Sequence, residues 1–313
     1  MAMSARTVMI PRTTAVDKIT VRGLKLRDIL NSHRAWLENG SGERADLSGA
    51  TLTDINLQRI NLQKAMLKGI TLLDANLSEA DLSGADLRGA DLRKATLVKA
   101  NLTGADLGHA DFSCCCLTEA SLSEAKMELT RFRGADLKQS RLYEVRMEGC
   151  DFTEAILNST FFNHCIGVEC SFADTDLEGA NFSHARIQRA RFTAAKLYHT
   201  CFTSAELKNC DFSGAQGASV KFSEANLSQC VFCRGIFVAC DFRSANLSAT
   251  DFTDAVLKES VFGDADLMAA DLRGAVLTGA RELSPYRLSR ARTSNSTTLP
   301  NGTKGPFIQR SGT

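Results

Sequence analysis

The sequence predicts a solenoid, a fold in which one short structural unit is stacked many times. Two observations lead to this prediction. From Leu47 to Leu277 every fifth residue is a large apolar side chain, with two exceptions, so that 47 consecutive five-residue units keep one register. Each unit also repeats a small residue, then Asp or Asn, then Leu or Phe, as residues 80–94 show three times in succession. A period of five is incompatible with a long helix or a flat strand, whose periods are 3.6 and 2.

This pattern resembles the repeats of the pentapeptide-repeat family. The resemblance covers residues 45–280, about three quarters of the chain. It implies an all-β fold, a right-handed quadrilateral β-helix with four units in each square coil. The central Leu or Phe and the small residue two positions before it are then expected to point inward. The resemblance does not imply one biochemical role, because fold and function separate easily.

Four units per coil place residues twenty apart in one column, at a spacing of about 4.8 Å. The sequence supports this arrangement, because large and smaller apolar residues sort into separate columns. One column from Leu117 to Leu197 contains leucine alone, and two columns ten residues apart, on opposite walls, contain phenylalanine alone. The first of these holds Phe112, Phe132, Phe152, Phe172, Phe192, Phe212, Phe232 and Phe252, and the second holds Phe162, Phe182, Phe202, Phe222, Phe242 and Phe262.

Two glycines interrupt the central positions. Gly217 leaves a hole, and we expect Phe237, the only phenylalanine in that column, to fill part of it. Gly167 lies between Met147 and Ile187, whose long side chains we expect to lean into the gap. We interpret both sites as local repacking and not as a ligand pocket.

Cysteine is frequent for a chain without a disulfide framework. Seven of the eleven cysteines occupy the small inward position, where we expect buried, reduced thiols. These are Cys115, Cys150, Cys165, Cys170, Cys210, Cys230 and Cys240. Cys114, Cys116, Cys201 and Cys233 fall at outward positions, with no CxxC pair or histidine partner. This usage is typical of a reducing cytoplasm.

The two ends depart from the repeat. We expect residues 1–16 to be a flexible arm and residues 17–44 to be an N-terminal cap, with a short strand at 19–22 and an amphipathic helix at 25–38. A cap is needed because the open backbone edge of the first coil invites pairing with other chains. His33 is expected to pack or hydrogen-bond in this cap. After the solenoid at 45–280, we expect a C-terminal cap at 281–292 and a disordered tail at 293–313.

Charge and hydropathy exclude several classes of protein. The net charge is +1, divided into −8 over residues 41–280, +4 before them and +5 after them. Nucleic acid is therefore not an expected partner. No apolar stretch approaches the about 20 residues that a membrane span needs, and the first residues lack a secretory signal. We expect a cytoplasmic protein with no membrane partner; secretion without a signal peptide stays open as an alternative.

Catalytic and cofactor motifs are missing from the sequence. No insertion interrupts the repeat to carry an active site, so we expect no catalytic residues, no cofactor and no enzyme activity. His164 and His184 share a column near Asn163, which makes a weak metal site one alternative. We favour a solvated surface pair, because no third ligand converges on them.

One run of basic residues departs from the repeat. Between residues 126 and 196 the position before the central residue is repeatedly Lys or Arg, where the repeat normally has Asp or Asn. We consider these residues a candidate contact surface for an acidic partner, against the alternative of a merely solvated charged face. They are Lys126, Arg131, Arg141, Arg146, Arg186, Arg191 and Lys196.

The sequence favours a noncatalytic, rigid scaffold for protein–protein interaction, whose partner is an unidentified protein or a second copy of the chain. Family resemblance suggests a bacterial origin and one alternative, a mimic of B-form DNA that binds a type II topoisomerase and confers quinolone resistance. That mimicry needs strongly negative faces, whereas one outward column here reads Asp46, Met66, Asp86, Asp106, Lys126, Arg146. A further alternative is a secreted effector that acts by binding host proteins.

Overall fold

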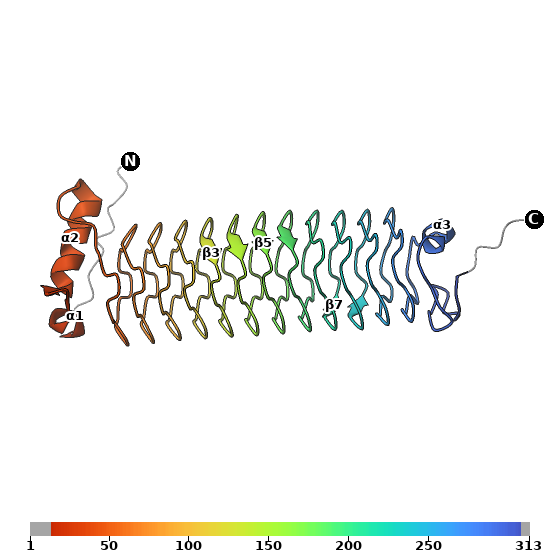
Figure 1. The fold of residues 1–313 in the computed structure, drawn as a ribbon, viewed down its shortest axis with the longest axis horizontal. Helices are drawn as coiled ribbons and strands as arrows, with labels where there is room; N and C mark the ends of the chain where they lie inside the picture. Colours follow the sequence, from red (N-terminus) through yellow and green to blue (C-terminus); the bar gives the residue numbers. More distant parts are fainter. Residues whose placement is uncertain (1–13, 308–313) are drawn as a thin grey trace, which may run out of the picture. The chain divides into compact units, whose positions relative to one another are not determined.

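Square coils make up most of the described chain. The computed structural model describes residues 14–307, and the chain forms two compact units, Met1–Arg146 and Met147–Thr313. In each unit the coils of a right-handed quadrilateral β-helix follow one another (Figure 1). The boundary between the units falls inside the repeat region, where the five-residue register continues unchanged.

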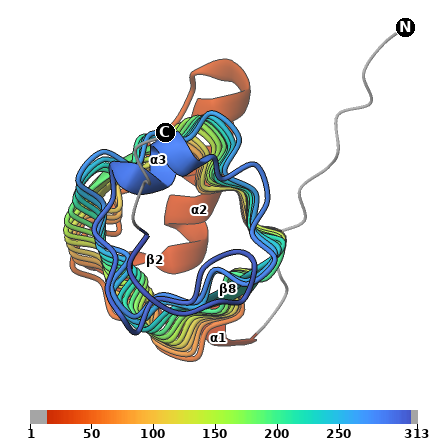
Figure 2. The same cartoon turned by 90° about the vertical axis from the view of Figure 1, so that its right-hand side faces the viewer.

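Backbone hydrogen bonds join each coil to the next in a twenty-residue register. In the first coil the Leu47 N–H donates to the Met66 carbonyl at 2.8 Å, and the Met66 N–H donates to the Ala45 carbonyl at 2.9 Å. Parallel bridges keep the same register, as between Asn61 and Asp81. Four five-residue units therefore complete one coil, whose four sides are visible in Figure 2. This confirms the predicted fold.

A tight turn makes each corner, and the repeat supplies what it needs. The Ala50 N–H donates to the Leu47 carbonyl at 3.0 Å, and Gly49, the third residue of this turn, has a φ of 69°. A positive φ at that place is the mark of a type II turn. The Asp or Asn before the central residue braces the corner: the Asp81 carboxylate accepts a 3.0 Å hydrogen bond from the Ser83 N–H.

Six three-residue strands form where the central residue departs from the usual Leu. Among the described residues, none of their corners is closed by the usual backbone hydrogen bond from the small inward residue to the central carbonyl. The chain therefore stays extended there, and β5 pairs with β6 and β7 with β8, both in parallel. The strands are β3 (Lys126–Glu128), β4 (Arg146–Glu148), β5 (Ile166–Val168), β6 (Arg186–Gln188), β7 (Gln216–Ala218) and β8 (Ile236–Val238).

The core consists of the predicted columns. In the first unit Phe112 and Phe132 stack with ring centroids 5.1 Å apart. In the second unit Phe152 stacks on Phe172 at 4.9 Å, and Phe162 of the opposite column meets Phe172 edge-on at 5.8 Å. All these rings are buried. The seven cysteines expected at inward positions are also buried, as free thiols.

The structure confirms one expected repacking at the glycines and corrects the other. A Cβ atom on Gly167 would meet Met147 Cε at 3.4 Å and Ile187 Cγ1 at 3.5 Å, so both side chains lean into the gap as expected. At Gly217 the nearest atom to such a Cβ is Val220 Cγ2, at 2.5 Å. Val220 holds a position that is usually alanine, and its larger side chain occupies the space beside Gly217. The prediction that Phe237 fills this space is therefore wrong.

The ring of Phe237 has a different neighbour. A Cβ atom on Gly235 would lie only 2.6 Å from Phe237 Cε2. Gly235 occupies the small inward position of the same five-residue unit, so the missing side chain there makes room for the larger ring. Phe237 also packs edge-on against Phe232, with centroids 5.1 Å apart.

A helical cap covers the first coil. It comprises α1 (Thr14–Lys18), β1 (Thr20–Val21), β2 (Leu24–Lys25) and α2 (Leu26–Asn39), and α2 lies across the end of the coils in Figures 1 and 2. The capping helix was predicted, and α1 was not. Of the arm expected at 1–16, residues 1–13 lie outside the described part. The remainder belongs to α1, where Val16 is fully buried.

The C-terminal segment closes the last coil. Helix α3 (Pro285–Ser289) is capped at its N-terminus by Ser284, whose hydroxyl accepts a hydrogen bond from the Arg287 N–H. The chain then returns to the coil, since the Leu277 N–H donates to the Thr298 carbonyl at 2.8 Å. Thr297 is fully buried. The expected disorder from residue 293 onward is therefore wrong for residues 293–307, and residues 308–313 lie outside the described part.

Candidate functional site

The basic residues singled out from the sequence lie on several walls. Those in the first unit are Lys126, Arg131, Arg141 and Arg146, and all are exposed. Lys126 and Arg146 are one coil apart on one wall, whereas Arg131 and Arg141 lie on other walls, because each step of five residues turns a corner. No ion pair joins any of these four side chains to another residue within 14–307.

The second unit carries the other three basic residues. Arg186, Arg191 and Lys196 follow one another on three successive walls of a coil, and all three are exposed. Arg186 lies 3.8 Å from the Glu206 carboxylate, a distance typical of a weak surface ion pair. In each unit these basic residues are therefore distributed over several walls of the coils and do not form a patch on one wall.

Each of these basic residues replaces a bracing side chain. At ordinary positions the Asp or Asn before the central residue accepts a hydrogen bond from the backbone two residues on, as Asn101 does from the Thr103 N–H at 3.1 Å. Lysine and arginine have no acceptor for this bond. The exchange thus removes a local stabilising contact and leaves an exposed cation.

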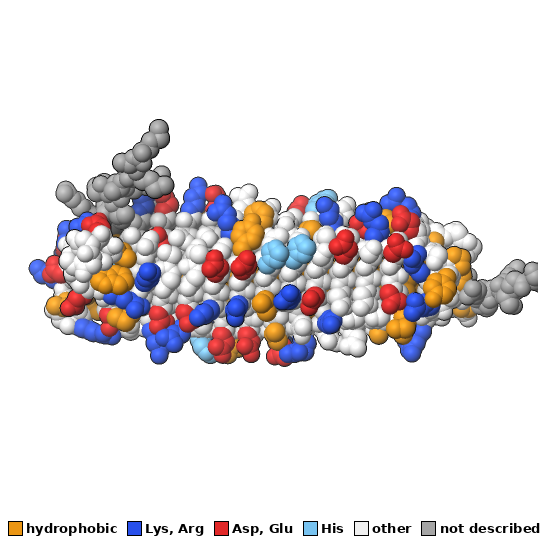
Figure 3. Space-filling model, turned by 90° about the horizontal axis from the view of Figure 1, so that it is seen from above, with side chains coloured by type: hydrophobic (Ala, Val, Ile, Leu, Met, Phe, Trp, Pro, Cys, Tyr) orange, Lys and Arg blue, Asp and Glu red, His pale blue; other side chains and the backbone are white. Residues whose placement is uncertain are grey.

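Elsewhere the walls mix positive and negative charges. Arginine two residues after an Asp forms a close ion pair with it, as between Arg88 and Asp86 at 2.6 Å and between Arg243 and Asp241 at 2.7 Å. A hydrogen bond from the arginine lowers the pKa of each aspartate below its ordinary value. Figure 3 shows blue and red side chains interspersed over one face. These aspartates stay ionised and locally neutralised.

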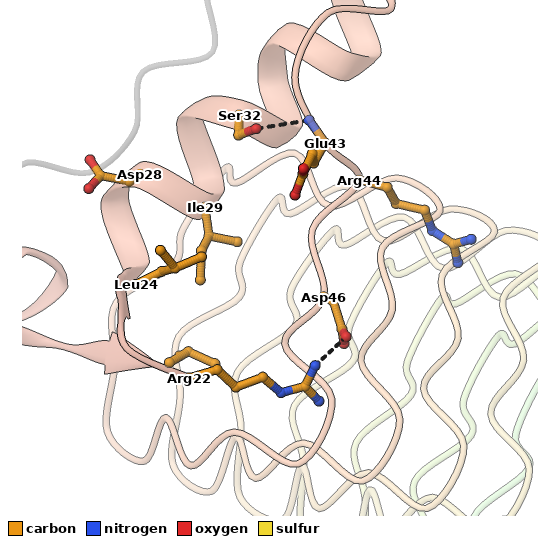
Figure 4. A pocket seen from close by; sticks show the side chains of 9 residues that line it. Arg22, Leu24, Asp28, Ile29, Ser32, Glu43, Arg44 and Asp46 are labelled. Atoms are coloured by element: carbon orange, nitrogen blue, oxygen red, sulfur yellow. Dashed lines mark hydrogen bonds and ion pairs between the residues drawn. The ribbon is translucent and has the colours of Figure 1, made fainter.

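A pocket of about 320 Å³ opens between the cap and the first coil (Figure 4). The apolar side chains of Leu24 and Ile29 form one side of it, and the Glu43 carboxylate points toward it from the segment that follows α2. Leu24 is 60% exposed, which is unusual for a residue that lines a cavity. The Arg22 guanidinium pairs with Asp46 at the edge. The sequence pattern gives no sign of this pocket, because the pocket depends on the β1–β2 hairpin that places Leu24 beside α2.

The pocket is held in place by the joint between cap and coil. His33 is fully buried, and its Nδ1 accepts a 3.1 Å hydrogen bond from the Ala45 N–H. Burial, together with the nearby Arg44 cation, lowers the pKa of His33 below its ordinary value. His33 stacks on Trp36 with ring centroids 5.6 Å apart. The predicted packing role of His33 agrees with these contacts.

The outward cysteines differ in their surroundings. Burial alone raises the pKa of the Cys201 thiol, but hydrogen bonds with Ser183 and Thr203 outweigh it and lower the pKa below its ordinary value. Burial, together with a hydrogen bond to Asp251, raises the pKa of Cys233 to about 12. Cys201 is therefore the more readily ionised of these two thiols.

The described residues show neither a three-ligand metal cluster nor a membrane-spanning helix. Within residues 14–307 no group of three or more His, Cys, Asp or Glu side chains is arranged to hold a metal ion. In the same part of the chain, none of the helices has the length and apolar character that crossing a bilayer requires. His164 and His184 do lie together, with stacked rings 5.2 Å apart.

The repeat itself identifies the family. A model of pentapeptide repeats matches in eight copies within residues 43–72, 75–113, 115–183 and 221–274, and a model of a pentapeptide repeat region matches residues 165–236. The chain belongs to the pentapeptide repeat family. A search of curated proteins gave no match to this pentapeptide repeat protein.

Several solved structures are similar to this pentapeptide repeat protein. HetL, a pentapeptide repeat protein involved in heterocyst differentiation regulation from the cyanobacterium Nostoc sp. strain PCC 7120, is 23% identical, with a TM-score of 0.34 over 87% of this chain and 96% of HetL. QnrB1, a plasmid-mediated fluoroquinolone resistance protein, is 16% identical, with a TM-score of 0.30 over 74% of this chain and 90% of QnrB1. A pentapeptide repeat protein of the Arabidopsis thaliana thylakoid lumen is 20% identical, with a TM-score of 0.14 over 50% of this chain and 81% of its own.

Proposed function

We propose that this pentapeptide repeat protein is a non-enzymatic scaffold that binds another protein through the outer walls of its coils. Within each unit, successive coils are tied together by backbone hydrogen bonds of 2.6–3.3 Å. A surface on such a framework needs no ordering when a partner binds, so little conformational entropy is lost on association. The cytoplasm is the compartment that we propose, since all eleven cysteines are free thiols.

The basic residues of the two units are the contact residues that we propose. The observation that carries this proposal is that Lys or Arg stands where the repeat normally has a bracing Asp or Asn. The substitution removes a corner hydrogen bond, and most of these basic side chains form no ion pair with another described residue. An acidic protein surface is the matching partner chemistry. Because the cations surround the coil, a partner that wraps around several walls suits them better than one that docks on a single wall.

Affinity capture from the native cells, followed by quantitative mass spectrometry, tests the scaffold function. The baits are the wild-type chain, the variants Arg146→Glu and Arg186→Glu, and the control Arg243→Glu. Arg243 is also an exposed arginine, but it is paired with Asp241 and lies outside the basic run. We expect a partner that the wild type and the control retain equally and that both test variants retain several-fold less.

Two results would count against the proposal in different ways. Equal retention by all four baits would show that the basic residues are not the contact surface, although the chain binds a protein. Failure of the wild type to enrich any protein above an unrelated bait would contradict the scaffold function itself. Retention by the wild type should also weaken as salt is added, because exposed charge pairs are screened within about 8–10 Å at physiological ionic strength.

A further inference from the structure

Two histidines face one another at a corner of the second unit. His164 and His184 each lie two residues beyond a buried phenylalanine, and both have a φ of 58°. Their imidazole rings are stacked, with centroids 5.2 Å apart and planes inclined by 7°. The shared corner and the twenty-residue register hold the two backbones at the spacing of adjacent strands, about 4.8 Å.

Both rings are available to a ligand. His164 and His184 are exposed. Neither imidazole forms a side-chain hydrogen bond or an ion pair with another residue in the described chain. The next residue of the column, Ser204, does not compete for them, because its hydroxyl donates to the Glu224 carboxylate at 2.8 Å.

The other exposed histidines differ from this pair because neither has a second histidine one coil away. His109 and His199 occupy the same corner position, with φ values of 60° and 57°. One coil away from His109 the equivalent residues are Gly89 and Leu129, and one coil away from His199 they are Gly179 and Ser219. His109 and His199 therefore have no second histidine beside them in their columns.

From this juxtaposition we propose that His164 and His184 form a binding site for a divalent transition-metal ion of the kind that prefers imidazole, such as Ni²⁺ or Zn²⁺. Neutral imidazole nitrogen is a favoured ligand of these ions. Rotation of two exposed side chains about their χ angles turns one nitrogen of each ring toward a shared ion, with water completing the coordination. The second imidazole binds at a high effective concentration because the coil holds it beside the first.

The bound ion links two successive coils of the second unit. It binds the folded pair and has no equivalent site in an unfolded chain, where the two histidines are separated by twenty residues. Binding therefore stabilises the folded state, by an amount that grows with the logarithm of the ion concentration once the site is saturated. It also competes with protons, because only the unprotonated ring is a ligand.

Calorimetric titration of the untagged full chain with Ni²⁺ under reducing conditions tests the site. The variants are His164→Asn and His184→Asn, with His199→Asn as the matched control. Asparagine tolerates a positive φ, and Asn209 already holds this corner position with a φ of 58°. We expect one ion per wild-type chain, at least about a tenfold weaker affinity for each test variant, and no change for the control.

A second readout separates the pair from other ligands. Ni²⁺ should raise the melting temperature of the wild type and of His199→Asn but not of the two test variants, and Mg²⁺ should raise none of them. Cys114→Ser should leave Ni²⁺ binding unchanged, which excludes the exposed thiol. Unchanged affinity in either test variant, or an equal loss in His199→Asn, would overturn the proposal.

Discussion

At the scale of single residues, the phenylalanines of the second unit form two interlocking ladders. Phe192 stacks on Phe172 at 4.8 Å and on Phe212 at 4.7 Å, and it meets Phe202 of the opposite column edge-on at 5.8 Å. Offset stacks and edge-to-face contacts are the arrangements that aromatic rings prefer. Each ring is thus held by neighbours on its own wall and on the wall opposite.

We expect Phe192→Ala to lower the free energy of unfolding by about 3–5 kcal/mol, because it leaves a cavity that rigid coils cannot close. Phe192→Leu should cost clearly less, since leucine fills much of that volume and occupies other columns. Chemical denaturation followed by circular dichroism measures both. A midpoint shift near zero for the alanine variant would contradict the ladder arrangement.

His33 makes the cap sensitive to pH. Its folded pKa is lowered, so the unfolded chain takes up a proton at a pH where the folded cap does not. The stability that neutral His33 contributes, through its contact with the Ala45 N–H, is fully present above about pH 6.5, the ordinary pKa of histidine, and decreases as the pH falls below that value. Fluorescence of Trp36, the only tryptophan, should report the opening. His33→Gln should remove this pH dependence; a response that persists would assign it to another group.

Sequence patterns predicted the columns of the core, but they did not fully predict which side chains fill the space left by a glycine. A central Phe or Leu must face inward whichever rotamer it adopts, so the columns follow from register alone. Register alone does not predict that Val220 fills the space at Gly217, because this depends on how the side chains of two positions share one cross-section of the coil. The same holds for Cys201, whose hydrogen bond with Ser183 joins two coils in addition to its local hydrogen bond with Thr203.

At the scale of elements, the two ends close their coils by different means. Helix α2 ends at Asn39 and is capped by Gly40, which has a φ of 75° and whose N–H donates to the Trp36 carbonyl. The C-terminal segment instead continues the coil: the Arg292 N–H donates to the Ala270 carbonyl and the Thr298 N–H to the Ala275 carbonyl. The amphipathic pattern of α2 can be recognised in the sequence. The polar composition of residues 293–307 instead predicts disorder, because the backbone pairing that orders them leaves no pattern in the sequence.

A chain ending after residue 292 should melt at least about 5 °C below the full chain. It loses several backbone hydrogen bonds and the buried Thr297 hydroxyl, which donates to the Leu272 carbonyl at 2.9 Å. Each lost bond costs about 1 kcal/mol, and 1 kcal/mol corresponds to about 2–4 °C in a chain of this size. A chain ending after Phe307 is the control and should melt with the full chain. Equal melting of both truncated chains would show that residues 293–307 contribute nothing to the last coil.

At the scale of the whole molecule, charge is balanced locally on the walls. Ion pairs such as Arg93–Asp91 at 2.7 Å and Arg273–Asp271 at 2.6 Å place a cation beside the acidic residue of the repeat. The sequence showed the position of each charge but not this pairing, which depends on side chains two residues apart lying on the same outer face. The candidate contact residues were predictable by position, and their spread over several walls follows from the square coil.

These ion pairs lead to a prediction about DNA mimicry. A protein that replaces DNA on a topoisomerase must present a continuous negative surface, and locally neutralised aspartates do not provide one. We therefore expect supercoiling by purified DNA gyrase to be unchanged at micromolar concentrations of this protein. Inhibition of supercoiling would show that binding to the enzyme does not require such a surface.

The corner turns have a consequence for how such a chain can change its length. Removing twenty residues takes out one full circuit and leaves every later side chain facing its former direction. Removing five keeps each apolar centre inside, yet it swings all that follows through a quarter turn. Short deletions can thus rearrange which surfaces lie next to one another while the interior stays intact.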